Sequence, residues 1–77
     1  DMIRTMKIIY RKYFSRSPAV CHGQLVYRGT RIPVSLTLQM LEGGDSVEDI
    51  LRGYPSLTRK SVQAAIRAAS EAVETVR

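Results

Sequence analysis

Four long hydrogen-bond donors lie close together after the midpoint of this 77-residue chain. They are Arg59, Lys60, Gln63 and Arg67, and their spacing places them on one face of a helix. Arg and Lys side chains pair with guanine or phosphate, and Gln pairs bidentately with adenine. A helix N-terminus also attracts phosphate through its unpaired amides. The spacing therefore predicts a DNA-binding surface, and the alternative is the ordinary polar outer face of a packed helix.

A second candidate surface lies near the N-terminus, where basic and aromatic residues are interleaved. We predict that Tyr10, Arg11, Tyr13 and Phe14 bind a partner. Such interleaving is typical of nucleic-acid contacts and of protein interfaces. The alternative is a strand that packs aromatic side chains on the helices and leaves a basic face in water. We favour that alternative for two of the three aromatic residues.

Residue types suited to catalysis or metal binding are sparse. Cys21 and His22 are adjacent, and neighbours in an extended segment point to opposite faces, so they do not pair as nucleophile and base. The chain holds one cysteine and one histidine, too few for a structural zinc site. A chain this short leaves little room for an enclosed substrate pocket. We therefore expect no enzyme activity, no catalytic residue, no metal, no cofactor and no small-molecule substrate.

The composition predicts one small globular unit with an uneven charge. Apolar residues make up 44% of the chain and charged residues 25%. The net charge is +6 over residues 1–31, −3 over 32–58 and +2 over 59–77. A basic arm and tail favour a polyanion or an acidic protein as partner, although a small soluble domain can simply carry excess Lys and Arg. No apolar run is long enough to cross a membrane, and a lone cysteine and the lack of a secretory signal lead us to expect a cytoplasmic protein.

Helix start and stop signals divide the second half of the chain into three helices, at about 34–42, 47–53 and 59–75. Pro33 opens the first helix, and Gly43-Gly44 closes it with a left-handed cap. Ser46 and Asp49 approximate a capping box for the second helix, and Thr58 is the expected N-cap of the third. Apolar residues recur along the third helix at helical spacing and predict its buried face. They are Val62, Ala65, Ile66, Ala69, Val73 and Val76.

The first third of the chain is expected to form a short β arm. Residues 7–14 are rich in β-forming side chains, and residues 24–27 are a second candidate strand. A tight turn is expected at Arg28-Gly29-Thr30, because glycine adopts backbone conformations closed to other residues. We therefore divide one structural domain into a basic β arm and turn, residues 1–33, and a mainly α three-helix bundle, residues 34–77.

The connection between the second and third predicted helices has the length found in a helix-turn-helix. Residues 54–57 join them, and in that motif the second helix enters the major groove of DNA. One small domain covers about 600–1,000 Å² of DNA, so useful specificity requires a homodimer that reads two half-sites.

The stretch Arg28-Gly29-Thr30-Arg31-Ile32-Pro33-Val34 resembles the signature of a widespread prokaryotic family, domain of unknown function four-three-three, described as VapB-like antitoxins. The likeness runs from about Ser17 to Val73. The resemblance implies a homeodomain-like three-helix bundle preceded by a short β segment. It also assigns Arg28, Gly29, Thr30, Arg31 and Pro33 to a structural turn. The chain departs from the family at His22-Gly23-Gln24 and at Arg59-Lys60, where relatives often have an acidic residue.

The family resemblance also implies a function. It predicts an antitoxin of a type II toxin–antitoxin pair that binds a PIN-like ribonuclease toxin and represses its own operon. Under this hypothesis the helix-turn-helix binds double-stranded operator DNA, and the arm binds the toxin or a second copy. One alternative is an interaction module that binds its partner through the arm and the acidic segment 42–49 without touching DNA. Another is a solitary transcriptional regulator.

Overall fold

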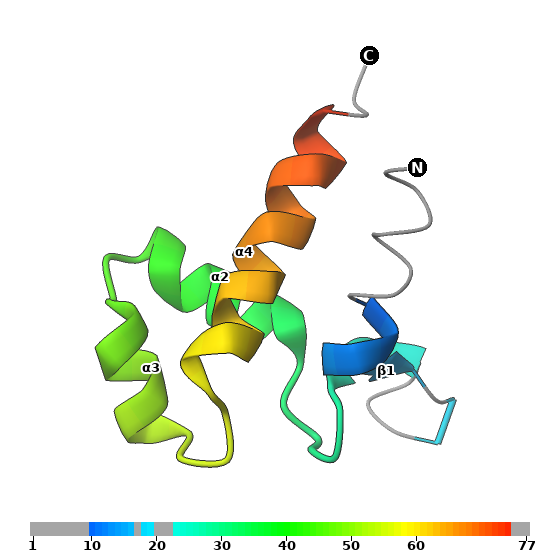
Figure 1. Cartoon of the computed structure of the whole chain (residues 1–77). Helices are drawn as coiled ribbons and strands as arrows, with labels where there is room; N and C mark the ends of the chain where they lie inside the picture. The colour runs from blue at the N-terminus through cyan, green and yellow to red at the C-terminus, as the bar shows by residue number, and fades with distance from the viewer. Residues whose placement is uncertain (1–9, 17, 20–22, 75–77) are drawn as a thin grey trace.

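The computed structural model of the chain describes residues 10–16, 18–19 and 23–74. This part is mostly helical, with a small two-stranded antiparallel sheet (Figure 1). In chain order the elements are β1 (Phe14–Arg16), β2 (Leu25–Tyr27), α2 (Val34–Glu42), α3 (Val47–Gly53) and α4 (Arg59–Glu74). The predicted bounds of α2 and α3 are confirmed. α4 is confirmed to Glu74, and residue 75 lies outside the described residues.

The caps of α2 follow from proline at one end and glycine at the other. Pro33 is the N-cap, in an extended conformation at φ −63° and ψ 137°. At the C-terminal end, the amides of Gly44 and Asp45 donate to the carbonyls of Leu41 and Met40 at 3.1 and 2.9 Å. This pattern is a Schellman motif, and Gly44 takes the left-handed position at φ +103°. A Cβ at Gly44 would meet no atom within 4 Å, so the requirement for glycine is conformational.

Reciprocal capping boxes begin α3 and α4. The Ser46 hydroxyl accepts from the Asp49 amide at 3.1 Å, and the Asp49 carboxylate accepts from the Ser46 amide at 2.9 Å. At α4 the Thr58 and Ser61 hydroxyls each accept from the other residue's amide at 3.1 Å. Both N-terminal caps predicted from the sequence are therefore confirmed.

The start of the predicted β arm is helical, which corrects the expectation of extended backbone up to Phe14. Tyr10–Tyr13 form a helical turn, β1 begins at Phe14, and residues 7–9 lie outside the described residues. β1 pairs with β2 in the register Phe14 to Tyr27 and Arg16 to Leu25. A helical turn stacks residues three and four apart, so it places the rings of Tyr10, Tyr13 and Phe14 together. Ring centroids of Tyr10 and Phe14 lie 5.6 Å apart, and this aromatic packing favours helix over strand.

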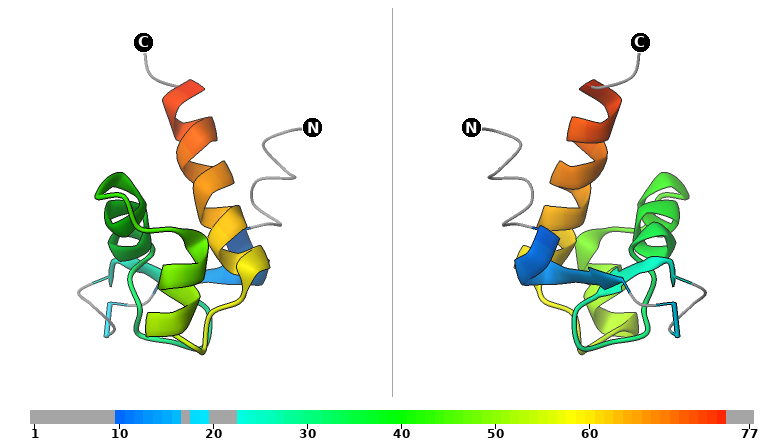
Figure 2. Two further views of the ribbon diagram at one scale, coloured as in Figure 1. Left: turned by 90° about the vertical axis from the view of Figure 1, so that its left-hand side faces the viewer. Right: turned by 90° about the vertical axis from the view of Figure 1, so that its right-hand side faces the viewer.

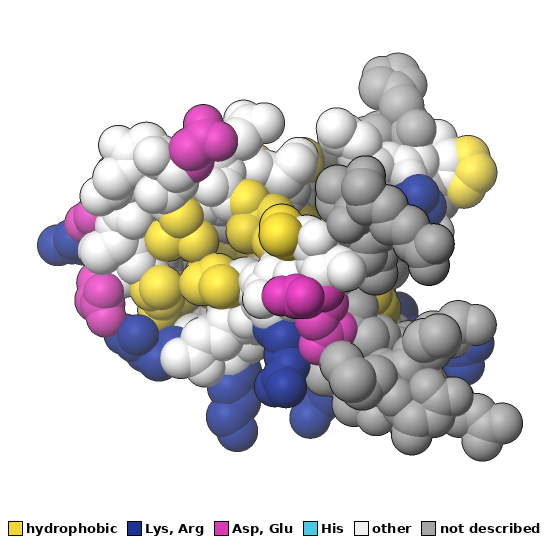
Figure 3. All heavy atoms as spheres, turned by 90° about the horizontal axis from the view of Figure 1, so that it is seen from above, with side chains coloured by type: hydrophobic (Ala, Val, Ile, Leu, Met, Phe, Trp, Pro, Cys, Tyr) yellow, Lys and Arg dark blue, Asp and Glu magenta, His cyan; other side chains and the backbone are white. Residues whose placement is uncertain are grey.

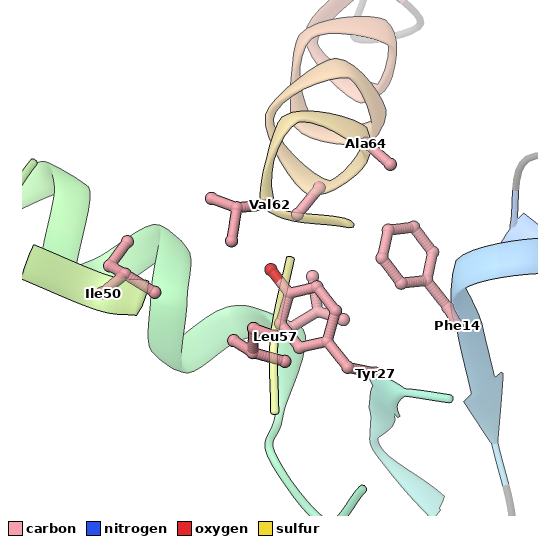
Figure 4. Close-up of a cluster of buried hydrophobic side chains, with 8 residues drawn as sticks. Phe14, Tyr27, Ile50, Leu57, Val62 and Ala64 are labelled. Atoms are coloured by element: carbon pink, nitrogen blue, oxygen red, sulfur yellow. The ribbon is translucent and has the colours of Figure 1, made fainter. Parts of the chain in front are cut away.

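The core forms where the arm, the start of α2, α3 and the first turns of α4 meet (Figure 4). Phe14 and Tyr27 are 1% exposed, and their rings pack edge to face at 5.7 Å. Ile50 from α3, Leu57 from the connection and Val62 from α4 close the cluster. Each large buried side chain contributes about 1.5–3 kcal/mol to stability.

The second half of α4 rises beyond the other described elements (Figure 2). As a result, the predicted apolar face of α4 is buried only in part. Val62 and Ala65 are fully buried, whereas Ile66 is 40% exposed and Val73 is 68% exposed. The prediction that Ile66 and Val73 are core residues is wrong, because the rest of the domain does not reach far enough along the helix. Val76 lies outside the described residues.

In the described part of the chain, none of the helices combines the length and hydropathy needed to cross a bilayer.

Candidate nucleic-acid interface

The polar face of α4 is open to solvent along its whole described length. Arg59, Lys60, Gln63 and Arg67 are all exposed. The opposite side of the helix carries Val62 and Ala65, both fully buried.

Three of the four predicted donors lie together in a shallow hollow of about 270 Å³. We call it the α4 groove, and it is lined by Tyr13, Lys60, Gln63, Ala64 and Arg67. Gln63 and Arg67 also line an adjoining hollow with Ile66 and Ser70, so the concave surface continues along the helix. Figure 3 shows Lys and Arg side chains gathered along the lower edge of the molecule in that view. The groove offers one aromatic ring, one amide and two cations.

Arg59 lies apart from the groove because it is bound to α3. Its guanidinium donates to the Glu48 carboxylate at 2.5 Å. This hydrogen bond is the main reason that the pKa of Glu48 lies below its ordinary value. The pair is exposed, at 50% for Arg59 and 60% for Glu48, and exposed ion pairs contribute little to stability. Arg59 can therefore exchange Glu48 for a phosphate at small cost, with its remaining donors still available.

Arg67 has a looser acidic neighbour one turn along α4. Its Nε lies 3.4 Å from the Glu71 carboxylate, and the Arg67 side chain is 69% exposed. A contact this long between residues at i and i+4 is weak. Arg67 therefore keeps most of its hydrogen-bonding capacity. The Glu71 Oε2 atom is buried and makes no hydrogen bond in the described structure.

The predicted partner-binding residues of the arm separate into a core residue and surface residues. Phe14 is buried at 1% exposure, so it supports the fold and offers no free surface, which corrects its predicted role. Tyr10 and Tyr13 are half-buried, and Arg11 is exposed. The Lys12 ammonium lies 5.4 Å from the centre of the Tyr13 ring. Tyr13 also lines the α4 groove, so the two candidate surfaces adjoin, which sequence spacing alone could not reveal.

The predicted structural turn is present, and the Arg28 side chain makes hydrogen bonds to the arm that the sequence did not predict. Gly29 has φ +78°, and the Thr30 amide donates to the Tyr27 carbonyl at 3.0 Å, which makes a type II turn. The Arg28 guanidinium donates to the carbonyls of Arg11 at 2.6 Å and Phe14 at 2.8 Å. Arg28 thereby joins the turn to the end of the arm's helical turn. Arg31 is exposed, and Pro33 forms a bridge with Val26 before it caps α2.

Acidic and metal-ligating side chains do not form a second site in the region the structure covers. Within residues 10–16, 18–19 and 23–74, no three His, Cys, Asp or Glu side chains gather closely enough to hold a metal ion. Cys21 and His22 lie outside the described residues. Asp49 accepts from the Ser46 amide, and this bond is the main reason for the low pKa of its carboxyl group.

Most of this chain matches one known protein family. Residues 15–68 match the family described as "Protein of unknown function (DUF433)". This match covers most of the sheet, the turn, α2, α3 and the groove-forming part of α4. The chain belongs to the DUF433 family. A comparison with curated proteins found no match for this DUF433 chain.

A solved structure supports the family assignment. This DUF433 chain is similar to the crystal structure of a DUF433 member protein from Anabaena variabilis ATCC 29413, with a TM-score of 0.75 and 28% sequence identity. The alignment covers 96% of this chain and 73% of the other. The family part of the resemblance seen in the signature Arg28–Val34 is therefore confirmed.

Proposed function

We propose that this protein binds double-stranded DNA through the α4 groove and acts as the DNA-contacting antitoxin of a type II toxin–antitoxin pair. The observation that carries the DNA proposal is the gathering of Lys60, Gln63 and Arg67 in one exposed hollow on α4. These side chains combine phosphate contacts with base-edge readout. The net charge of +5 supports attraction to a polyanion.

In this proposal α3 and α4 act as a homeodomain-like helix-turn-helix. Residues 54–58 connect them, and the Leu57 amide donates to the Tyr54 carbonyl at 3.0 Å in a turn that contains Pro55. α4 would then enter the major groove with the donors of its first half, and Arg59 would bind the backbone beside it. The repressor form would be a homodimer on two half-sites.

The proposed protein partner is a PIN-like ribonuclease toxin that binds the arm. Tyr10, Arg11 and Tyr13 would supply this contact, and Phe14 would support it from the core. Half-buried tyrosines beside cationic side chains are typical of interface residues. The proposal includes a cytoplasmic location and no catalytic activity or cofactor.

The DNA proposal is tested by neutralising two cations of the groove. The Lys60→Gln/Arg67→Gln variant should lose most retardation of a mixed-sequence duplex of about 30 base pairs, long enough for two half-sites. The slope of the logarithm of the binding constant against the logarithm of salt concentration should become less steep by about one for each phosphate contact that is lost. The matched control is Arg16→Gln/Arg52→Gln, which removes the same charge from exposed positions outside the groove. Equal weakening by both variants would show a general charge effect and contradict the proposal.

The second candidate is a module that binds a protein partner without DNA, and the half-buried Tyr10 and Tyr13 favour it. The salt dependence of binding distinguishes the two functions. DNA binding through several phosphates should weaken steeply between about 50 and 200 mM salt, whereas an aromatic interface should change little. A solitary transcriptional regulator would share the DNA result and lack the toxin.

A further inference from the structure

A small polar cavity lies between the arm with its turn and the connection that precedes α4. Its volume is about 160 Å³, and it is lined by Lys12 and Arg28 from the first of these segments and by Ser56 and Thr58 from the second. We call it the Arg28 cavity. The two segments are far apart in the chain, so only the fold brings these side chains together. The volume is below the roughly 300–1,000 Å³ of pockets for drug-sized ligands, so the cavity suits a small group.

The charge of the cavity is positive and uncompensated. Its described lining holds two cations, Lys12 and Arg28, and no acidic side chain. Among the described residues, the carboxylates that form ion pairs bind cations of α3 and α4, and neither Lys12 nor Arg28 has such a partner. All acidic residues of the chain except Asp1 belong to the described part. Two cations without a counter-charge in one hollow attract an anion.

The Arg28 guanidinium is held in place and still has donors to offer. Its Nε donates to the Arg11 carbonyl at 2.6 Å, and Nη2 donates to the Phe14 carbonyl at 2.8 Å. A guanidinium has five N–H donors, so these two bonds leave the others available within the described structure. Carbonyl oxygens carry no full charge, so the cation is fixed without being neutralised. A fixed guanidinium suits phosphate because its planar fork binds two oxygens at once.

Two hydroxyl groups of the cavity are donors that the described fold does not use. The Thr58 hydroxyl accepts from the Ser61 amide at 3.1 Å, and its own proton has no acceptor among the described residues. The exposed Ser56 hydroxyl makes no hydrogen bond to any described residue. The capping box of Thr58 and Ser61 already occupies the amides of both residues, so the donors of the cavity are side chains. Hydroxyl groups beside Lys and Arg are the usual ligands of phosphate oxygens.

We propose that the Arg28 cavity binds a phosphate group, with Arg28 and Lys12 as the cations and with Ser56 and Thr58 as hydroxyl donors. The buried Tyr27 and Leu57 also line the cavity, and the low dielectric constant beneath the charges strengthens their attraction for an anion.

Two sources supply the same phosphate chemistry. One is a free phosphate ion, and the other is a backbone phosphate of DNA bound in the α4 groove, which adjoins the cavity because Tyr13 lines both. The DNA source rests on the proposed function, whereas binding of free phosphate does not.

Titration of the isotopically labelled 77-residue chain with inorganic phosphate tests the site, with sodium chloride holding the ionic strength constant. The amide NMR shifts of Arg28, Ser56 and Thr58 should saturate with a dissociation constant of about 1–10 mM. Lys12→Gln should weaken phosphate binding by about tenfold, because it removes a charge-assisted contact. Arg11→Gln removes the same charge from the adjacent exposed residue, which does not line the cavity, and should weaken binding by about twofold at most.

Ser56→Ala tests a directed contact, since it removes one hydroxyl group without a change in charge. It should weaken phosphate binding by about threefold and keep the parent thermal midpoint, because Ser56 is exposed. Shifts that do not saturate by about 50 mM phosphate would overturn the inference. So would equal weakening by Lys12→Gln and Arg11→Gln, or parent affinity in Ser56→Ala.

Retardation of a duplex of about 30 base pairs identifies the source of the phosphate. If a DNA phosphate fills the cavity, Lys12→Gln should weaken retardation more than Arg11→Gln does and make the salt slope less steep by about one. If free phosphate fills it, both variants should retard the duplex equally, while Lys12→Gln still loses phosphate binding. A chain that binds phosphate but no DNA would support the site and contradict the proposed function. A chain that binds DNA without saturable phosphate shifts would overturn the site and leave the proposed function standing.

Discussion

At the scale of single residues, Arg28 joins the two ends of the arm. It is the first residue of the family signature, and its guanidinium joins the carbonyls of Arg11 and Phe14. The Arg28 amide also donates to the Tyr13 carbonyl at 2.8 Å. These bonds satisfy carbonyls at the end of a helical turn, where partners within the helix are missing. The signature arginine therefore has a structural role, and the family match alone says nothing of DNA.

Replacement of Arg28 tests this role. Arg28→Lys keeps the charge but loses the fork that reaches two carbonyls, so it should destabilise the fold by about 1–3 kcal/mol in urea unfolding. Arg16→Lys at the exposed end of β1 is the control and should change stability little. If Arg28→Lys were as stable as the parent, the carbonyl contacts would contribute nothing to the fold.

Tyr27 and Thr37 form a second residue pair, buried between the arm and α2. Their hydroxyl oxygens lie 2.7 Å apart, and the Thr37 hydroxyl donates to the Val34 carbonyl at 2.8 Å. A hydroxyl has one proton, so Tyr27 must be the donor to Thr37. Burial is the main reason that the pKa of Tyr27 lies above its ordinary value.

The direction of this hydrogen bond, from Tyr27 to Thr37, predicts that two substitutions have unequal effects on stability. Thr37→Val leaves the Tyr27 hydroxyl buried without an acceptor and should cost about 1–3 kcal/mol. Tyr27→Phe removes the donor, keeps the bond of Thr37 to Val34, and should cost about 1 kcal/mol or less. Thermal unfolding of both variants measures the difference. A larger loss for Tyr27→Phe would contradict the assigned direction of the bond.

At the scale of elements, two carboxylates near the start of α3 make the stability of the chain depend on pH. The pKa of Glu48 is lowered mainly by the hydrogen bond from Arg59, and that of Asp49 mainly by the bond from the Ser46 amide. A lowered folded-state pKa stabilises the fold above the unfolded values of about 3.9 and 4.3, and this stabilisation is lost as pH falls through the lower folded values.

The thermal midpoint should therefore fall between about pH 5 and pH 2. Asp49→Asn removes one of the two groups, so this variant should have a smaller fall over the same range. Circular dichroism at 222 nm, the ordinary α-helix signal, follows the transition. A midpoint that is constant or rises on acidification would show that neither carboxylate stabilises the folded chain.

The helices could be predicted from the sequence because each has its own local stop and start signals. Ser46, Thr58 and the Gly43-Gly44 pair act within a few residues, so their effect does not depend on the rest of the fold. The conformation of residues 10–13 was mispredicted because it depends on a partner far along the chain, the Arg28 side chain. The exposure of Ile66 and Val73 was missed for a related reason: periodicity shows that a helix has an apolar face, but not how far other elements cover it.

Part of the candidate site was also predictable from local sequence alone. Lys60, Gln63 and Arg67 lie on one helix, so helical spacing alone brings them together. Tyr13 joins them only through the packing of the arm on α4, which sequence spacing does not encode. Helical spacing also groups Arg59 with these donors, whereas its bond to Glu48 ties it to α3.

At the scale of the whole molecule, the residues that stabilise the fold differ from the residues that are exposed and available for binding. The core combines the buried side of α4 with residues of the aromatic arm, α2 and α3, and this leaves the cationic face of α4, together with Ile66 and Val73, exposed on the same helix.

Amide and side-chain NMR shifts of the isotopically labelled chain, titrated with a mixed-sequence duplex of about 30 base pairs, test the central claim most directly. The account predicts that the largest shifts fall on Lys60, Gln63, Arg67 and Tyr13, and that they diminish as salt rises from about 50 to 200 mM. Shifts confined to other surfaces, or no shifts at low salt, would contradict DNA binding by the α4 groove.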